Sequence, residues 1–117
     1  MLKIKIQIYC GDHIAMGPGK ADLLDMIDRE GSISAAGRKM GMSYRRCWLL
    51  VDAMNRCWAQ PLVATSSEGA TLTPMGVAIL RDYRALQRAT EGAGQAAWPM
   101  LERHLRAEPL ASQDAQS

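Results

Sequence analysis

Three kinds of side chain in this sequence could carry chemistry: three cysteines, two histidines and a cluster of arginines. Cys47 and Cys57 are ten residues apart, so on one helix they would point about 80° apart and lie about 15 Å apart along the axis. They cannot form a disulfide within that helix, and Cys47 fits an apolar stripe as a core residue. His13 and His104 lie near opposite ends of the chain, without a partner at a spacing that would make a nucleophile pair or a metal site. We therefore expect no enzyme, no metal site and no cofactor.

The basic residues point instead to a polyanion. Residues 31–56 carry a net charge of +4, whereas residues 1–30 and 57–117 each carry −1, so the total of +2 hides a local excess. The basic side chains of this stretch are Arg38, Lys39, Arg45, Arg46 and Arg56, and its one acid is Asp52. A nucleic acid would bind in this stretch if it binds at all.

Length and composition exclude several classes of protein. A chain of 117 residues with 48% hydrophobic and 22% charged residues suits one globular domain. No apolar run approaches the roughly 20 residues that span a bilayer, and the N-terminus alternates Ile with Lys instead of forming a signal sequence. Gly17-Pro18-Gly19-Lys20 lacks the spacing of a phosphate-binding loop and predicts a turn. Three cysteines do not make a disulfide framework, so we expect a cytoplasmic protein.

The elements that would position the arginines follow from periodicity. Residues 2–10 alternate apolar with polar side chains, which predicts a strand with one buried side. A helix follows, striped by Leu23, Leu24 and Ile27 and closed by Gly31. Residues 33–59 then predict a helix-turn-helix: a thin first helix with Ser32 or Ser34 as N-cap, a turn at Gly41, and a second helix capped by Ser43. The inner face of that second helix consists of Cys47, Leu50, Val51, Met54 and Trp58.

The second half of the chain predicts a wing and a long helix. Residues 62–72 read as a short hairpin, and Thr73-Pro74 starts a helix over residues 74–98 that Pro99 breaks or kinks. Heptad spacing along this helix predicts a dimerisation seam. Its members are Ile79, Tyr83, Leu86, Thr90 and Ala93. We expect the leading strand to pair beside the wing, one domain over residues 1–107, and a disordered tail over residues 108–117. The predicted fold is mainly α with a small β-sheet, a winged helix-turn-helix.

The second helix of the helix-turn-helix is the expected recognition element. Such a helix enters the major groove of DNA with its N-terminal residues against base edges, and Arg45 and Arg46 occupy its first turn. An Arg guanidinium can donate to O6 and N7 of guanine together. Arg38 and Lys39 would lie where phosphates cross the preceding helix. Trp48 is expected to pack beneath that helix, with direct DNA contact as the alternative.

The chain also resembles a known family. GPGKADLLDMIDREGSISAAGRKMGMSYRRCWLLVDAMN, followed by PLVATS and LTPMG, is similar to the N-terminal DNA-binding domain of the molybdate-responsive ModE regulators, a winged helix related to that of LysR-type regulators. The resemblance runs from about Ile4 to Arg88. It implies a bacterial homodimer that binds a palindromic operator, with the leading strand and the trailing helix at the dimer interface.

The resemblance also implies which residues contact DNA. Matched by position, they are Ser34 and Lys39 in the first helix of the motif, Ser43, Tyr44, Arg45 and Arg46 in the recognition helix, and Ser66 and Ser67 in the wing. The wing is shorter than is usual in the family, and Glu68 would repel phosphate. The chain ends about 30 residues beyond the matching part, so no molybdate-binding domain is expected and molybdate is not predicted as an effector.

The sequence thus predicts sequence-specific binding of double-stranded DNA by a homodimeric transcriptional regulator. Two alternatives stay open: a metal- or redox-responsive winged-helix sensor that uses its Cys or His residues, and a module that binds proteins instead of DNA. The sequence does not specify the operator, the target genes or the sign of regulation.

Overall fold

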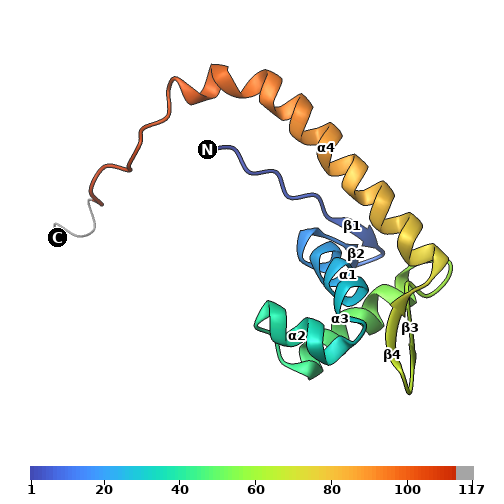
Figure 1. The fold of residues 1–117 in the computed structure, drawn as a ribbon. Coiled ribbons are helices and arrows are strands. Elements are labelled where there is room, and N and C mark those ends of the chain that lie inside the picture. The colour runs from blue at the N-terminus through green and yellow to red at the C-terminus, as the bar shows by residue number, and fades with distance from the viewer. Residues whose placement is uncertain (113–117) are drawn as a thin grey trace.

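The computed structural model describes residues 1–112. Its elements in chain order are β1 (Ile8–Cys10), β2 (His13–Met16), α1 (Pro18–Glu30), α2 (Ile33–Met40), α3 (Tyr44–Cys57), β3 (Val63–Ser66), β4 (Gly69–Leu72) and α4 (Pro74–Glu102). Three helices and two hairpins form a globular part, and α4 extends far beyond it (Figure 1). The predicted fold, mainly helical with small β elements and a long C-terminal helix, is confirmed.

Side-chain caps fix the starts of three helices. The Ser32 hydroxyl accepts a hydrogen bond from the backbone N–H of Ala35 (3.0 Å), the Ser43 hydroxyl one from Arg46 (3.1 Å), and the Thr73 hydroxyl one from Gly76 (3.0 Å). Each cap satisfies a backbone donor that the first turn leaves without a partner. Of the two serines considered for α2, Ser32 takes this role, and Ser34 lies inside the helix.

The core lies between α1, α2 and α3 and extends to the hairpins and the start of α4. The sequence has no Phe, and no charged or polar side chain is buried within the described residues 1–112. The largest fully buried members of the core are Met16, Leu23, Leu24, Ile27, Cys47, Met54, Leu62 and Tyr83. Aliphatic and thioether side chains fill the space that rings occupy in most domains of this size.

The N-terminal prediction was wrong in two respects. Only Ile8–Cys10 forms a strand, and it pairs antiparallel with His13–Met16 through a two-residue turn, not with the wing. Gly11, with φ of 59°, provides the left-handed backbone that this turn requires. Residues 1–7 lie alongside α4 instead of joining a sheet, although their apolar side chains still alternate toward the protein (Figure 1).

Contacts far apart in sequence hold the N-terminal segment on α4. The Tyr83 hydroxyl donates a hydrogen bond to the backbone carbonyl of Ile6 at 2.7 Å. Farther along, a Cβ on Gly94 would come within 2.6 Å of the Ile4 side chain and 3.2 Å of the Leu2 side chain. Residues 2–4 therefore lie against α4 at Gly94, where a larger residue would not fit.

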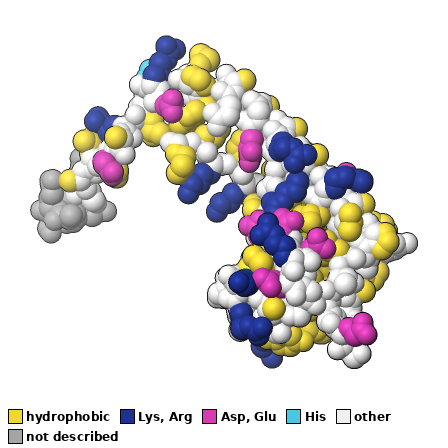
Figure 2. Space-filling model, viewed as in Figure 1, with side chains coloured by type: hydrophobic (Ala, Val, Ile, Leu, Met, Phe, Trp, Pro, Cys, Tyr) yellow, Lys and Arg dark blue, Asp and Glu magenta, His cyan; other side chains and the backbone are white. Residues whose placement is uncertain are grey.

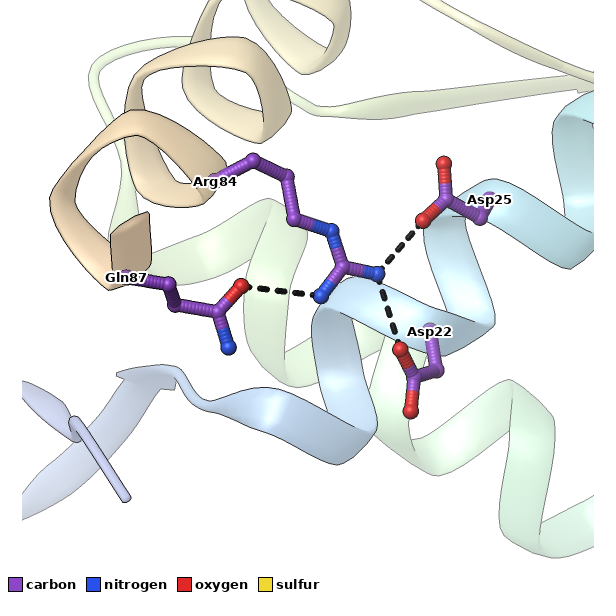
Figure 3. A network of polar contacts seen from close by, with 4 residues as sticks. All are labelled: Asp22, Asp25, Arg84 and Gln87. Atoms are coloured by element: carbon purple, nitrogen blue, oxygen red, sulfur yellow. Dashed lines mark hydrogen bonds and ion pairs between the residues drawn. The ribbon is translucent and has the colours of Figure 1, made fainter. Parts of the chain in front are cut away.

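Arg84 joins α4 to α1 (Figure 3). Its Nη2 donates to Asp22 at 2.8 Å and to Asp25 at 2.5 Å, and its Nη1 donates to Gln87 at 2.9 Å. Burial lowers the pKa of the Arg84 guanidinium, but the hydrogen bonds and charges of the two carboxylates outweigh it, so the net shift is upward. This cluster fixes the direction in which α4 leaves the globular part.

The far end of α4 also differs from expectation. The helix was expected to end at residue 98 and to break or kink at Pro99, whereas it continues through Pro99 to Glu102. Residues 108–112 form neither helix nor strand, and the predicted disorder of residues 113–117 lies outside the described residues. Within residues 1–112, no helix is long and apolar enough to cross a membrane.

Two glycines of α4 provide a matched test of the packing. A Cβ on Gly76 would lie 2.1 Å from the backbone carbonyl oxygen of Leu62, while a Cβ on Gly92 meets nothing within 4 Å. We expect Gly76→Ala to lower the free energy of unfolding by about 2–4 kcal/mol, because backbone must move. Gly92→Ala should raise it by about 0.5–1 kcal/mol through helix propensity. Urea denaturation measures both, and equal effects would contradict the close approach at Gly76.

Candidate nucleic-acid interface

The angle between α2 and α3 is set by a close contact at Gly37. A Cβ at this position would lie 2.9 Å from the Cys47 Sγ and 3.1 Å from the Met42 carbonyl oxygen. The Met42 N–H donates to the Gly37 carbonyl at 2.8 Å, which closes the turn between the helices. α3 therefore packs directly on the backbone of α2, as the small residues of that helix predict.

The first turn of α3 is exposed. Ser43 caps it, and Tyr44, Arg45 and Arg46 all lie on the surface. Cys47, the next residue, is fully buried, and burial raises the pKa of its thiol, with the charge of Arg46 acting in the opposite direction. The burial boundary thus falls between Arg46 and Cys47, and it leaves both arginines outside.

The exposed face of α3 continues with apolar side chains. Trp48 is 47% exposed and Leu49 48% exposed. The expectation that Trp48 packs beneath α2 is therefore wrong, because Cys47 and not Trp48 occupies the inner position against Gly37. One surface thus offers cationic, aromatic and aliphatic groups side by side.

The wing lies next to the start of α3. Ser34 of α2, Tyr44 of α3 and Ser66 of β3 line one groove of about 180 Å³. β3 and β4 pair from Val63 with Leu72 to Ser66 with Gly69, which leaves Ser67 and Glu68 as the two turn residues. The structure thus brings together predicted site residues from three elements.

The basic side chains of residues 31–56 differ in their partners. Lys39 Nζ lies 4.0 Å from the Glu30 carboxylate, and Arg56 Nε lies 3.2 Å from the Asp52 carboxylate. Arg38, Arg45 and Arg46 form no ion pair with an acidic side chain of residues 1–112. These three guanidinium groups hold the charge that is available to a ligand. Figure 2 shows both basic and acidic side chains across the globular part, so the surface as a whole is mixed in sign.

The predicted dimerisation residues divide into two groups. Ile79 packs against the core of its own chain, and Tyr83 is 2% exposed and bonded to Ile6, so Tyr83 cannot meet a second chain. Leu86 (41% exposed) and Ala93 lie on the surface, with Thr90 half-buried between them. The part of α4 that a second chain could contact therefore starts at Leu86. Figure 2 shows hydrophobic side chains along the part of α4 that extends beyond the globular part.

Asn55 positions α3 against the wing, and sequence reasoning missed it. Its Oδ1 accepts hydrogen bonds from the backbone N–H groups of Leu62 (2.8 Å) and Val63 (3.1 Å), and its Nδ2 donates to the Val63 carbonyl (3.2 Å). An Asn in the last turn of an otherwise apolar-striped helix, shortly before a strand, was the available signal.

A helix-turn-helix followed by a hairpin wing defines the class of this domain as a winged helix-turn-helix. Residues 20–77 match the model of the family described as "Bacterial regulatory helix-turn-helix protein, lysR family". Among solved structures, the complex of the CbnR DNA-binding domain with DNA covers 71% of this chain and 95% of that chain, with a TM-score of 0.59 and 19% identity. The structural match at this low identity shows a common fold alone.

Curated relatives share more of the sequence. Molybdenum-pterin-binding protein MopB of Rhodobacter capsulatus is 42% identical over 77 residues, which cover 62% of this chain and 28% of the relative. Molybdenum transport protein ModE of Azotobacter vinelandii is 36% identical over 78 residues, or 62% of this chain and 29% of the relative. The resemblance to the ModE N-terminal domain is confirmed, and the chain spans less than a third of the length of these two relatives. Within residues 1–112, no group of three His, Cys, Asp or Glu side chains could hold a metal ion.

Substitutions of Asn55 separate its acceptor and donor roles. Asn55→Ala leaves two backbone N–H groups and one carbonyl without partners, and we expect a loss of about 2–4 kcal/mol in the free energy of unfolding. Asn55→Asp keeps both acceptor contacts but sets a carboxylate oxygen against the Val63 carbonyl, so its loss should decrease at low pH, where the protonated carboxyl can donate again. Denaturant titration at neutral and at low pH gives these values. A loss for Ala below about 1 kcal/mol would mean that the Asn55 contacts do not hold the wing.

Proposed function

We propose that this chain is a transcriptional regulator that binds double-stranded DNA as a homodimer, with α3 in the major groove. The observation that carries the proposal is the exposed first turn of α3, where Arg45 and Arg46 pair with no acidic side chain of residues 1–112 and the helix packs tightly on α2. The proposed DNA-binding unit comprises residues 1–107. Since bacterial DNA lies in the cytoplasm, the proposal implies that location for the protein.

Base recognition is assigned to the outer face of α3. Arg45 and Arg46 can each donate two hydrogen bonds to a guanine, and the Tyr44 hydroxyl can reach a base or a phosphate. Trp48 and Leu49 add exposed apolar surface, which suits the methyl group of thymine. This combination favours a site that contains both G·C and A·T pairs.

Phosphate contacts are assigned to the rim around α3. Ser34 of α2 and Ser66 of the wing line the groove beside Tyr44. Lys39 of α2 and Ser67 of the wing are exposed, and we assign phosphate contacts to them as well. Lys39 is exposed, and its 4.0 Å contact with Glu30 is weak enough to yield to a phosphate. Glu68 shares the turn of the wing with Ser67, so we assign phosphate contact to the two serines and not to Glu68.

Dimerisation is assigned to α4. Leu86 and Ala93 point within about 20° of each other on a helix of 100° per residue, and Thr90 lies nearby. The N-terminal segment lies on the adjoining strip around Gly94. A second copy that packs on Leu86, Thr90 and Ala93 would contact α4 and the N-terminal segment together. A dimer with twofold symmetry would require a palindromic operator.

DNA binding by α3 is testable with a duplex selected by the native protein from a random library. Arg45→Ala and Arg46→Ala should each weaken binding by about 1–3 kcal/mol and relax the preference at one base pair. Arg81→Ala, on the exposed side of α4, is the matched control and should bind normally. Affinity of the native protein should fall by orders of magnitude between low and moderate salt. If the double variant binds the selected duplex with native affinity in a gel shift, the recognition helix has been assigned incorrectly.

A charged substitution on α4 tests the proposed dimer interface. Leu86→Asp places a carboxylate where the two copies of α4 would meet, and light scattering should then give the monomer mass. Arg88→Asp, two residues along on another face of α4, should leave the dimer intact. If the Leu86→Asp protein is still dimeric, the interface does not lie on this strip of α4.

A further inference from the structure

Two of the three cysteines converge in one small pocket. Cys10 ends β1, and Cys57 is the last residue of α3. Both line a cavity of about 110 Å³ together with His13, which is the cross-strand partner of Cys10 in the first hairpin. Residues 47 positions apart in sequence are thus neighbours in space.

The two thiols stand on elements that are fixed to each other. Immediately after Cys57, the Trp58 indole N–H donates to the backbone carbonyl of Ala15 in β2 at 3.1 Å. Ala15 is itself buried in the core. This hydrogen bond joins the first hairpin to the end of α3 beside both cysteines, so the two elements hold the thiols close to each other.

The two thiols differ in exposure and acidity. Cys10 is exposed, and Cys57 is partly buried. Burial raises the pKa of the Cys57 thiol, and the neighbouring Cys10 raises it further, against the opposing charges of Arg56 and Lys20. Cys57 is therefore a protonated thiol at neutral pH, whereas Cys10 meets solutes first. Cys47 is separate from this pair because it is fully buried between α2 and α3.

We propose that Cys10 and Cys57 form a dithiol that hydrogen peroxide oxidises to a disulfide joining β1 to the end of α3. The Cys10 thiol gives its proton to the imidazole of His13 or to water, and its sulfur attacks one peroxide oxygen. The O–O bond breaks, Cys10 becomes a sulfenic acid, and the departing hydroxide takes up a proton to form water. The Cys57 sulfur then attacks the Cys10 sulfur, loses its own proton and expels a second water. Two thiols are oxidised and one peroxide is reduced to two waters.

The cross-link would enclose a large part of the domain. The loop from residue 10 to residue 57 contains β2, α1, α2 and all of α3, so the disulfide restricts the unfolded chain strongly. The thiol chemistry and the gain in stability are independent of DNA, so they can be tested whether or not the proposed function holds.

Tryptic peptides make the pairing directly readable. Cleavage after Lys and Arg places Cys10 in residues 6–20, Cys47 in residues 47–56 and Cys57 in residues 57–81, one cysteine in each peptide. Native protein is treated with hydrogen peroxide, its remaining thiols are alkylated in denaturant, and the digest is analysed by mass spectrometry. We expect peptides 6–20 and 57–81 to be linked and peptide 47–56 to be alkylated.

Isotope labelling and variants complete the test. In a mixture of unlabelled and nitrogen-15-labelled protein, an intramolecular bond gives no mixed pair. The melting temperature should rise by on the order of 10 °C on oxidation and return on reduction. Cys47→Ser should behave like the native protein, while Cys10→Ser, an exposed change on the hairpin, should lose both the link and the shift. Mixed-isotope pairs, linkage through Cys47, or oxidation of single cysteines without a link would each overturn the proposal.

Discussion

The contact between Gly37 and Cys47 is the constraint on which the arrangement of the molecule depends. Without a Cβ at residue 37, the Cys47 thiol of α3 rests on the backbone of α2, and the two helices lie closer than a larger residue at this position would allow. This places one face of α3 inward and turns the opposite face, with Arg45 and Trp48, to the surface. The outward direction of the recognition residues is therefore set from inside the domain.

Residues at the C-terminal end of α3 hold both hairpins in position against this helix. Asn55 bonds to the backbone of residues 62 and 63, and Trp58 bonds to Ala15. All of these hydrogen bonds join a side chain to the main chain, and within residues 1–112 the core contains no buried charged side chain. The ion pairs of Arg84 join α4 to α1 and do not involve the helix-turn-helix. The ionic groups of the domain therefore lie at its surface, where salt screens their interactions most.

The sequence was sufficient to predict most elements but not all of their partners. Helical periodicity, the Ser43 and Thr73 caps and the terminal glycines predicted the helices because these signals are local. The partner of β1 was missed although Gly11-Asp12 between apolar residues is a hairpin signal, because the alternation of residues 2–10 suggested one long strand. The exposure of Trp48 and the burial of Tyr83 could not be read from periodicity, since each depends on how closely a distant segment approaches. Asn55 was missed for the same reason.

The position of the N-terminal segment has a consequence for how the chain folds during synthesis. Residues 1–7 are synthesised well before Tyr83 and Gly94, the residues that they contact. Until α4 has been made, an extended stretch rich in isoleucine has no surface on which to pack. Helices α1 to α3 can pack among themselves in the meantime, because their contacts are local. The docking of residues 1–7 on α4 therefore follows the synthesis of every element that lies between them.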